Sequence, residues 1–198
     1  MEGLLFVLSG PSGVGKNTVL KKVLAKRTDL TYSISATTRP PRGQEVDGVD
    51  YYFLSKEQFW AECQNNGFLE WAEIYGHYYG TPKKQVLALI QKGQHVILDV
   101  DIQGAAQIRQ NYANAVLIFL HPPSITELTR RLRERKTEDE DAIKKRLAYL
   151  EKELAAVTSY DYVVVNDQLE EACRRVEAII NAEEVKVTRG YWKRFLNP

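Results

Sequence analysis

The sequence predicts an α/β fold in which helices flank a central, mostly parallel sheet. Four short apolar runs, rich in β-branched residues, have the length and continuous apolarity of strands buried on both faces. The runs cover residues 4–8, 96–100, 116–120 and 162–165. Helical patterns lie between them, and this alternation is typical of a parallel sheet. The third observation is a glycine-rich turn at residues 10–16, directly after the first predicted strand.

This turn has the residues of a phosphate-binding loop, Gly10-Pro11-Ser12-Gly13-Val14-Gly15-Lys16. Glycines allow backbone N–H groups to turn toward phosphate oxygens without a Cβ in the way. The helix predicted to begin near Lys16 points the positive end of its dipole at the same anion, and the lysine adds a full charge. A strand, a glycine-rich turn, a lysine and a helix in this order indicate a P-loop. A glycine-rich turn without a ligand is the alternative.

The residue after the lysine departs from the usual P-loop pattern. Ser or Thr normally stands there and ligates Mg²⁺ through its hydroxyl, whereas this chain has Asn17 followed by Thr18. Either Thr18 takes over the hydroxyl role, or the metal is held mainly by the nucleotide and water. Asp99 and Asp101 are further candidates for metal-bound water or for substrate, because ligands of open α/β sheets lie beyond the carboxyl ends of strands. A role in the turn is the alternative for both.

Length and composition restrict the class of protein. The chain has 198 residues, 44% of them hydrophobic, which suits one globular domain. A net charge of +1 gives no general attraction to nucleic acid or anionic membranes. The apolar runs are too short for a transmembrane helix, and the first residues do not have the pattern of a signal peptide. Cys63 and Cys173 have no metal-type spacing and predict reduced thiols in a cytoplasmic protein.

Residues 36–94 interrupt the alternation of strands and helices. The segment opens with a loop rich in Pro, Gly and Arg, and it contains two strand-like runs and two helical patterns, at residues 51–54, 68–74, 56–64 and 83–92. We interpret it as a small mixed subdomain inserted between two parts of the core, residues 1–35 and 95–188. Insertions that close over a P-loop bring in a second substrate and exclude water.

The inserted segment contains polar groups that suit a second nucleotide. Arg39 and Arg42 lie three residues apart in a proline-stiffened loop, and arginine forks match the geometry of phosphate. Glu70 lies in an otherwise apolar and aromatic strand, where a partly desolvated carboxylate requires paired donors. Guanine offers such a pair at N1–H and the 2-amino group, whereas adenine has an acceptor at N1. A solvated loop and an ordinary edge-strand glutamate are the alternatives.

A cluster of arginines suggests a lid over about residues 131–146. Arg131, Arg133 and Arg135 precede an acidic run, and Arg146 follows it. Such charges are either a solvated helix face or cations that a lid brings to a transferring phosphoryl group.

Together these motifs resemble the guanylate kinase family over about residues 4–182. The matching segments are residues 9–16, 37–39, 41–42, 45, 48, 50–51, 68–72, 78–80, 97–104 and 165–167. The resemblance implies a single domain over residues 1–198, with a P-loop core, a GMP-binding insertion and a helical lid. It also implies transfer of the γ-phosphoryl group of ATP to GMP with Mg²⁺, with dGMP as a second acceptor.

The resemblance further implies roles for individual residues. GMP would be bound by Ser35, Arg39, Arg42, Tyr51, Glu70, Tyr79, Thr81 and Asp101. ATP would be bound by Gly10, Pro11, Ser12, Gly13, Val14, Gly15, Lys16, Asn17, Thr18 and Asn166. The transferring phosphoryl group would be served by Lys16, Arg39, Arg131, Arg135 and Arg146. Two departures from the family pattern concern glycines. The glycine of the family's Pro-Arg-x-Gly-Glu motif stands one place earlier here, at Gly43. In the lid, Glu134 and Lys136 replace two glycines.

Three functions are compatible with this pattern. The first is an active guanylate kinase, and the second is a P-loop kinase for another phosphorylated acceptor, which the base-reading set Glu70, Thr81 and Asp101 disfavours. The third is a binding module without activity, which the intact Lys16 disfavours. An acceptor phosphate is already largely ionised at neutral pH, so no strong general base is expected. A monomer and a homo-oligomer both fit the sequence.

Overall fold

The computed structural model describes residues 2–134, 150–151 and 153–196. Its central sheet has five strands, all parallel, in the order β2-β7-β1-β8-β9. The strands are β1 (Leu5–Ser9), β2 (Leu30–Tyr32), β7 (His95–Asp99), β8 (Val116–His121) and β9 (Tyr162–Val165). The carboxyl ends of β1 and β7 therefore lie side by side, directly before the P-loop and Asp101.

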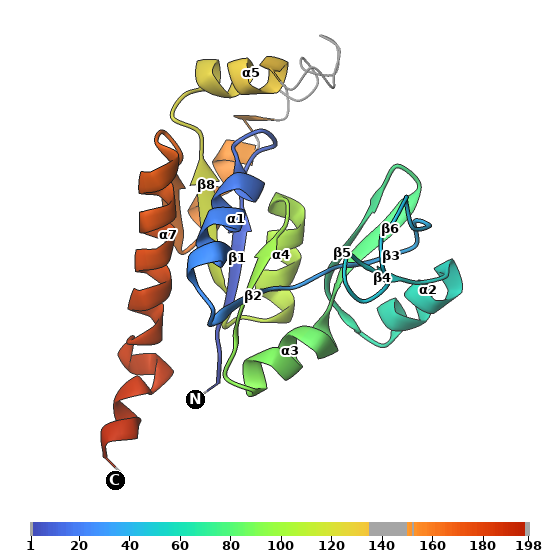
Figure 1. The fold of residues 1–198 in the computed structure, drawn as a ribbon, viewed down its shortest axis with the longest axis horizontal. Coiled ribbons are helices and arrows are strands. Elements are labelled where there is room, and N and C mark those ends of the chain that lie inside the picture. The colour runs from blue at the N-terminus through green and yellow to red at the C-terminus, as the bar shows by residue number, and fades with distance from the viewer. Residues whose placement is uncertain (1, 135–149, 152, 197–198) are drawn as a thin grey trace.

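Helices cover both faces of this sheet (Figure 1). Helices α1 (Lys16–Lys26) and α7 (Leu169–Glu184) pack on one face, and α3 (Lys83–Gln91) and α4 (Ile102–Asn111) on the other. Alternate residues of one strand serve the two faces: Phe6 and Leu8 belong to the first core cluster, and Leu5 and Val7 to the second. Burial on both faces explains why the strands read as continuous apolar runs.

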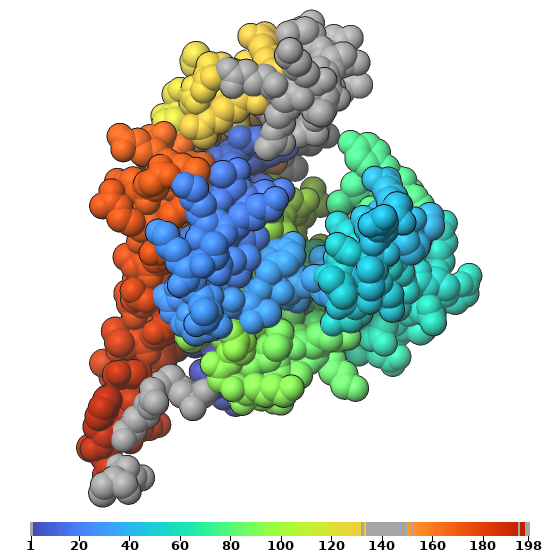
Figure 2. All heavy atoms as spheres, in the orientation of Figure 1, coloured from blue at the N-terminus to red at the C-terminus, as the bar shows by residue number. Residues whose placement is uncertain are grey.

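A second, smaller sheet lies beside the core, and the surface is hollowed between the two (Figures 1 and 2). It has the strand order β4-β3-β6-β5. Its strands are β3 (Ala36–Thr37), β4 (Tyr52–Phe53), β5 (Phe68–Ile74) and β6 (His77–Pro82), and helix α2 (Lys56–Gln64) packs on it. Phe59 of α2 is fully buried against the rings of Phe68, Trp71 and Tyr78. This aromatic cluster is the core of the smaller sheet.

Outside these two sheets the described residues include helix α5, three short 3₁₀ helices and further helical residues at 150–151 and 153–155. Helix α5 (Ile125–Glu134) follows β8, beyond the carboxyl ends of the strands (Figure 1). The 3₁₀ helices are η1 (Ala156–Ser159), η2 (Val187–Arg189) and η3 (Tyr191–Phe195). Among the described residues, no helix has both the length and the apolarity needed to cross a bilayer.

The strands and helices predicted from apolar runs are confirmed, with boundaries that differ by at most one residue. Strand β2 was not predicted, because it has only three residues and exposes Tyr32 at the edge of the sheet. Strands β3 and β6 were also not predicted: β3 has two residues, and β6 is interrupted by Gly80 and ends in Pro82.

The patterns Ser55-x-x-Gln58, Ser124-x-x-Glu127 and Thr137-x-x-Glu140 predict capping boxes at three helix starts. At Ser55 both hydrogen bonds of the box with Gln58 are present. At Ser124 the hydroxyl accepts from the backbone N–H of Glu127, but the Glu127 carboxylate binds Arg130 and Arg131 instead of completing the box. The box of Thr137 and Glu140 lies outside the described residues.

The burial of Phe59 predicts that Phe59→Ala lowers the free energy of unfolding by about 3–5 kcal/mol, through lost burial and the cavity left behind. Trp60→Ala is the matched control, since Trp60 is the next residue of α2 and is 40% exposed. Urea unfolding of both variants measures the difference. Equal losses would contradict a core centred on Phe59.

Candidate active site

The glycine-rich turn wraps beyond the carboxyl end of β1, and its backbone favours glycine at two positions. A Cβ on Gly10 would lie 2.3 Å from the carbonyl oxygen of Leu120, and one on Gly15 would lie 2.6 Å from Nδ2 of Asn166. Both residues also have positive φ, of 145° and 101°. Gly15 is the N-cap of α1, so the loop ends at the positive end of that helix dipole. This is the geometry of an anion-binding loop.

Lys16, the first residue of α1, reaches back over this loop. Its Nζ donates to the carbonyl oxygens of Gly10 and Pro11, at 2.8 and 3.5 Å. Asp99 lies at the end of the neighbouring strand β7, where burial raises the pKa of its carboxyl group and the charge of Lys16 partly opposes that rise. A cation and a carboxylate therefore share the space beyond β1 and β7.

A cavity of about 430 Å³ opens on the α7 side of the loop. It is lined by Gly13, Gly15, Thr18, Arg131, Asn166, Asp167 and Leu169. Asn166 and Arg131 both donate to the carbonyl oxygen of Val14, at 2.8 and 3.4 Å. Glu127 holds Arg131 at 2.8 Å, and the hydrogen bonds from Arg130 and Arg131 lower the pKa of Glu127 to about 2. The predicted ATP residues Thr18 and Asn166 thus lie together beside the loop.

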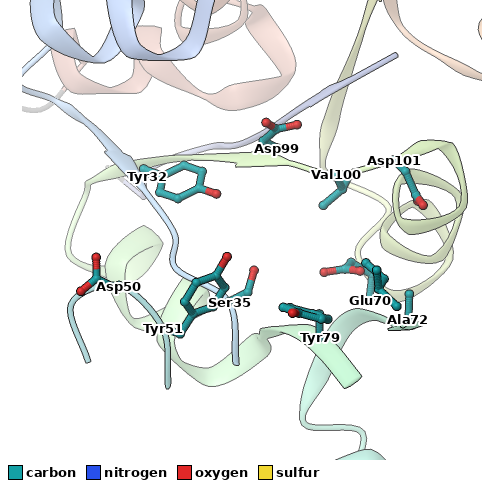
Figure 3. Close-up of a pocket in the computed structure, with 11 residues that line it drawn as sticks. Tyr32, Ser35, Asp50, Tyr51, Glu70, Ala72, Tyr79, Asp99, Val100 and Asp101 are labelled. Atoms are coloured by element: carbon teal, nitrogen blue, oxygen red, sulfur yellow. The ribbon is translucent and has the colours of Figure 1, made fainter. Parts of the chain in front are cut away.

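A second cavity, of about 320 Å³, lies between the carboxyl end of β7 and the smaller sheet. Its lining residues are Tyr32, Ser35, Asp50, Tyr51, Glu70, Ala72, Ile74, Tyr79, Asp99, Val100 and Asp101. Glu70 and Asp101 lie at one end, and Asp50 and Tyr51 at the other (Figure 3). Asp99 lines this cavity and is also close enough to Lys16 to feel its charge, so the cavity and the P-loop meet there.

Glu70 is a buried carboxylate at the wall of this cavity. It is 9% exposed, and its Oε1 accepts from the Thr81 hydroxyl at 2.5 Å. Burial raises the pKa of Glu70 from its usual 4.5 to about 7; the Thr81 bond opposes this and the charge of Asp101 adds to it. Asp101 is the N-cap of α4, where its Oδ1 accepts from the N–H of Gly104 at 2.8 Å. The site thus has acceptors ready for a ligand with adjacent donors.

The predicted arginine pair is arranged differently from the rest of the predicted set. Arg39 is 5% exposed and forms two bonds with the carboxylate of Glu45, each of 2.9 Å. The backbone N–H of Arg42 also donates to Glu45, at 2.7 Å. Neither arginine is among the described residues that line the cavity, although the guanidinium of Arg39 lies 5.3 Å from the ring centre of Tyr51. Glu45 therefore neutralises Arg39, a role that its sequence position did not reveal.

The structure brings together most of the residues predicted to bind GMP. Ser35, Tyr51, Glu70, Tyr79 and Asp101 line one cavity, and Thr81 joins it through Glu70. Sequence reasoning missed Tyr32 and Asp50, which also line it. Tyr32 was missed because its strand was not recognised. Arg135 and Arg146, with most of the predicted lid, lie outside the described residues.

One group of three potential metal ligands occurs among the described residues, and it lies away from the P-loop. Asp29, His95 and Glu184 have ligand atoms within 4.8 Å of one another at the amino end of β7. Arg27 binds both carboxylates at 2.5 Å, and Nδ1 of His95 accepts from the N–H of Leu4. The guanidinium already supplies the cation there, so the group is an ion-pair network.

A P-loop at the carboxyl edge of a parallel sheet, next to a second polar cavity, defines a nucleotide-binding protein of the P-loop class. Residues 3–183 match the family model described as guanylate kinase. The chain belongs to the guanylate kinase family.

Known proteins support this assignment along nearly the whole chain. The guanylate kinase of Caldanaerobacter subterraneus subsp. tengcongensis is 48% identical over 189 residues, covering 96% of this chain and 92% of that protein. The guanylate kinase of Carboxydothermus hydrogenoformans is 47% identical, covering 95% and 92%. The crystal structure of guanylate kinase from Anaplasma phagocytophilum has a TM-score of 0.71 and 36% identity, and the match covers 93% of this chain and 88% of that one.

The raised pKa of Glu70 predicts how the stability of the ligand-free protein depends on pH. Because the unfolded chain releases this proton near pH 4.5 and the folded chain near pH 7, the contribution of Glu70 falls as pH rises from 4.5 to 7, by up to about 3 kcal/mol. Glu70→Gln should remove this part of the pH dependence and stabilise the protein at pH 8. Thermal unfolding between pH 4.5 and 8 measures it.

The matched control is Glu73→Gln, an exposed glutamate of the same strand. It should keep the wild-type pH dependence. The same pH dependence in Glu70→Gln and in the wild type would mean that Glu70 is not the group responsible.

Proposed function

We propose that this protein transfers the γ-phosphoryl group of ATP to GMP and releases ADP and GDP. The observation that carries the proposal is the buried carboxylate of Glu70, which faces a cavity that meets the P-loop at Asp99. The P-loop suits the phosphates of a nucleoside triphosphate, and the cavity beside Glu70 suits a nucleotide with adjacent hydrogen-bond donors on its base. The names of the relatives, all guanylate kinases, support the same reaction.

Recognition of the base is assigned to Glu70, Thr81 and Asp101. Ionised Glu70 accepts from guanine N1–H and from the 2-amino group, and Thr81 and Asp101 add polar contacts to the base. Adenine would place an acceptor against this carboxylate and leave it without a donor, which is a strong basis for rejection. Since the assigned contacts go to base and phosphate, dGMP is proposed as a second acceptor.

The acceptor phosphate is assigned to the opposite end of the cavity. Tyr51 lies at that end, the ring centre of Tyr79 lies 6.1 Å from that of Tyr51, and Ser35 lines the same cavity. Hydroxyl groups donate to phosphate oxygens. The guanidinium of Arg39 lies 5.3 Å from the ring centre of Tyr51, and Arg42 follows on the loop that Glu45 holds. A phosphate bound there would share Arg39 with Glu45, which keeps the guanidinium oriented before the anion arrives.

The ATP phosphates are assigned to the P-loop, and the chemistry depends on alignment and charge. Lys16 would exchange the loop carbonyls for phosphate oxygens, and Arg131 is held at the loop by Val14 and Asn166. The acceptor oxygen is already ionised, so the residues orient two phosphates and offset their repulsion without a general base. Arg135 and Arg146 are assigned the same task from the family resemblance alone.

Mg²⁺ fits oxygen donors that line the two cavities. Asp99 provides a carboxylate in the second cavity and Thr18 a hydroxyl in the first, both hard oxygen groups, and Asn17 precedes Thr18 in α1. Bound with ATP, the ion neutralises charge that develops on the phosphate oxygens. Most of its ligands are expected to come from the nucleotide and from water.

A cytoplasmic location remains a prediction from cysteine usage.

The direct test is ADP formation from Mg-ATP with GMP, AMP, CMP and UMP offered separately. The proposal predicts turnover with GMP and a preference over AMP on the order of 10⁴-fold, because a site built around paired hydrogen bonds rejects the unpaired base. Glu70→Ala should raise the KM for GMP much more than the KM for ATP. Absence of turnover, with GMP still binding in calorimetry, would favour a binding module.

The position of Lys16 predicts that Lys16→Ala reduces phosphoryl transfer by about 10²- to 10³-fold, because a preorganised cation is lost. Binding of GMP should stay within about twofold of wild type, since the second cavity does not include Lys16. Steady-state kinetics and calorimetry measure the two effects. Lys21→Ala, an exposed lysine on the same helix, is the control. Full activity of Lys16→Ala would remove the P-loop lysine from the mechanism.

A further inference from the structure

Strand β5 contains one residue more than its partner at the point where Glu70 lies. Phe68 pairs with Pro82, but the next pair along the strand is Trp71 with Gly80, so the register shifts between them. Leu69 and Glu70 together therefore stand opposite Thr81. One extra residue on one strand of an antiparallel pair is a β-bulge, and bulges re-aim side chains.

The bulge determines which face of the smaller sheet carries the Glu70 carboxylate. In a regular register Leu69 would stand opposite Thr81, and Glu70 opposite Gly80, on the other face of the sheet. With the bulge, the Glu70 carboxylate accepts from the Thr81 hydroxyl and lines the cavity (Figure 3). Leu69 is fully buried in the core cluster that contains Ala105 and Ile108 of α4. The bulge thus places Glu70 in the cavity while Leu69 packs on α4.

Strand β5 is also the edge strand of its sheet, so the outward N–H and C=O groups of its backbone need partners. Side chains of helix α4 are hydrogen-bond partners for some of these backbone groups. Oε1 of Gln107 accepts from the N–H of Trp71, and its Nε2 donates to the carbonyl oxygen of Trp71, both at 3.0 Å. Asn111 donates to the carbonyl oxygen of Leu69 at 2.9 Å. The residues on both sides of Glu70 are therefore held by α4.

Helix α4 also approaches the Glu70 side chain itself. A Cβ on Gly104 would lie 3.2 Å from Oε2 of Glu70 and 3.5 Å from Oδ1 of Asp101. Gly104, Gln107 and Asn111 are spaced three and four residues apart, so they share one face of the helix. That face holds the bulge, and the N-cap of the same helix places Asp101 in the cavity.

We propose that Gln107 is a positioning residue for acceptor specificity: its carboxamide, together with Asn111, fixes the Leu69–Glu70 bulge so that the carboxylate meets both donors of guanine. This inference rests on the proposed reading of guanine by Glu70. In this role Gln107 does not contact the substrate, and it acts through the backbone of Trp71. The bidentate contact reproduces the bonds that a neighbouring strand would make, but from a helix that also contributes to the base site.

The alternative is that Gln107 only protects an exposed strand edge. In that case its loss would reduce stability, and activity toward every acceptor would fall alike. A positioning role predicts a change in discrimination. IMP separates the two explanations, because it has the N1–H of GMP but no 2-amino group. The preference for GMP over IMP therefore depends on whether the Glu70 carboxylate lies where it can accept from the 2-amino group.

The experiment compares wild type with Gln107→Ala, Gln107→Glu and the control Gln110→Ala, an exposed glutamine one turn further along α4. For Gln107→Ala we expect the KM for GMP to rise roughly 10- to 100-fold, because small misplacements of binding groups have effects of this size. The ratio of kcat/KM for GMP over IMP should fall by about fivefold or more. The KM for ATP and the kcat at saturating GMP should stay near wild type, as should all values of Gln110→Ala.

Gln107→Glu keeps the acceptor for Trp71 N–H and loses the donor to the Trp71 carbonyl, so the same changes are expected at smaller size. This variant decides the question if Gln107→Ala does not fold. An unchanged GMP-to-IMP ratio in a folded Gln107 variant, or equal loss toward both acceptors, would overturn the proposal. A wild type that does not prefer GMP, or a Glu70→Ala variant that keeps the preference, would instead overturn the proposed function itself.

Discussion

Burial of the Glu70 carboxylate is the constraint on which the arrangement around the second cavity depends. With 9% exposure its charged form loses most of its hydration, and burial accordingly raises its pKa to about 7. The Thr81 hydroxyl donates to this carboxylate in the ligand-free protein, and the charge of Asp101 opposes its ionisation. In the proposed function the donors of guanine complete its hydrogen bonds. A group that is destabilising alone thus becomes favourable only with the correct base, which is how burial produces selectivity.

The cations of the site are arranged by a related principle. Lys16 lies on the carbonyl oxygens of its own loop, Arg39 on Glu45, and Arg131 on Glu127 and Val14. Each positive group is therefore oriented by an internal acceptor before any phosphate arrives. Because a phosphate would replace an existing partner, the free energy gained per contact is smaller. The long side chains, however, do not have to be ordered during binding, since they already lie close to the positions in which they would contact phosphate.

Much of this could be predicted from the sequence, because local patterns carry it. Continuous apolar runs gave the central strands, and the glycine and lysine spacing gave the loop. The remainder depends on contacts between distant segments. Strand β2 is too short for a periodic signal, and Glu45 looks like any loop carboxylate until the chain brings it to Arg39. The bulge at Glu70 was not visible either, since an extra residue is defined only by the partner strand.

Helix α4 explains how the smaller sheet is placed with respect to the core. Ala105 and Ile108 pack in the core cluster of the central sheet, while Gln107 and Asn111, on a neighbouring face, hold the edge of β5. The absence of a side chain at Gly104 sets the distance, because a Cβ would lie 3.1 Å from Val100 as well as 3.2 Å from the Glu70 carboxylate. A larger residue would push the helix and β5 apart and stretch the carboxamide bonds of Gln107. Close approach, hydrogen bonding and the position of Asp101 are therefore set together by one rigid helix, so Glu70 and Asp101 keep a fixed relation to the strand that ends at Asp99.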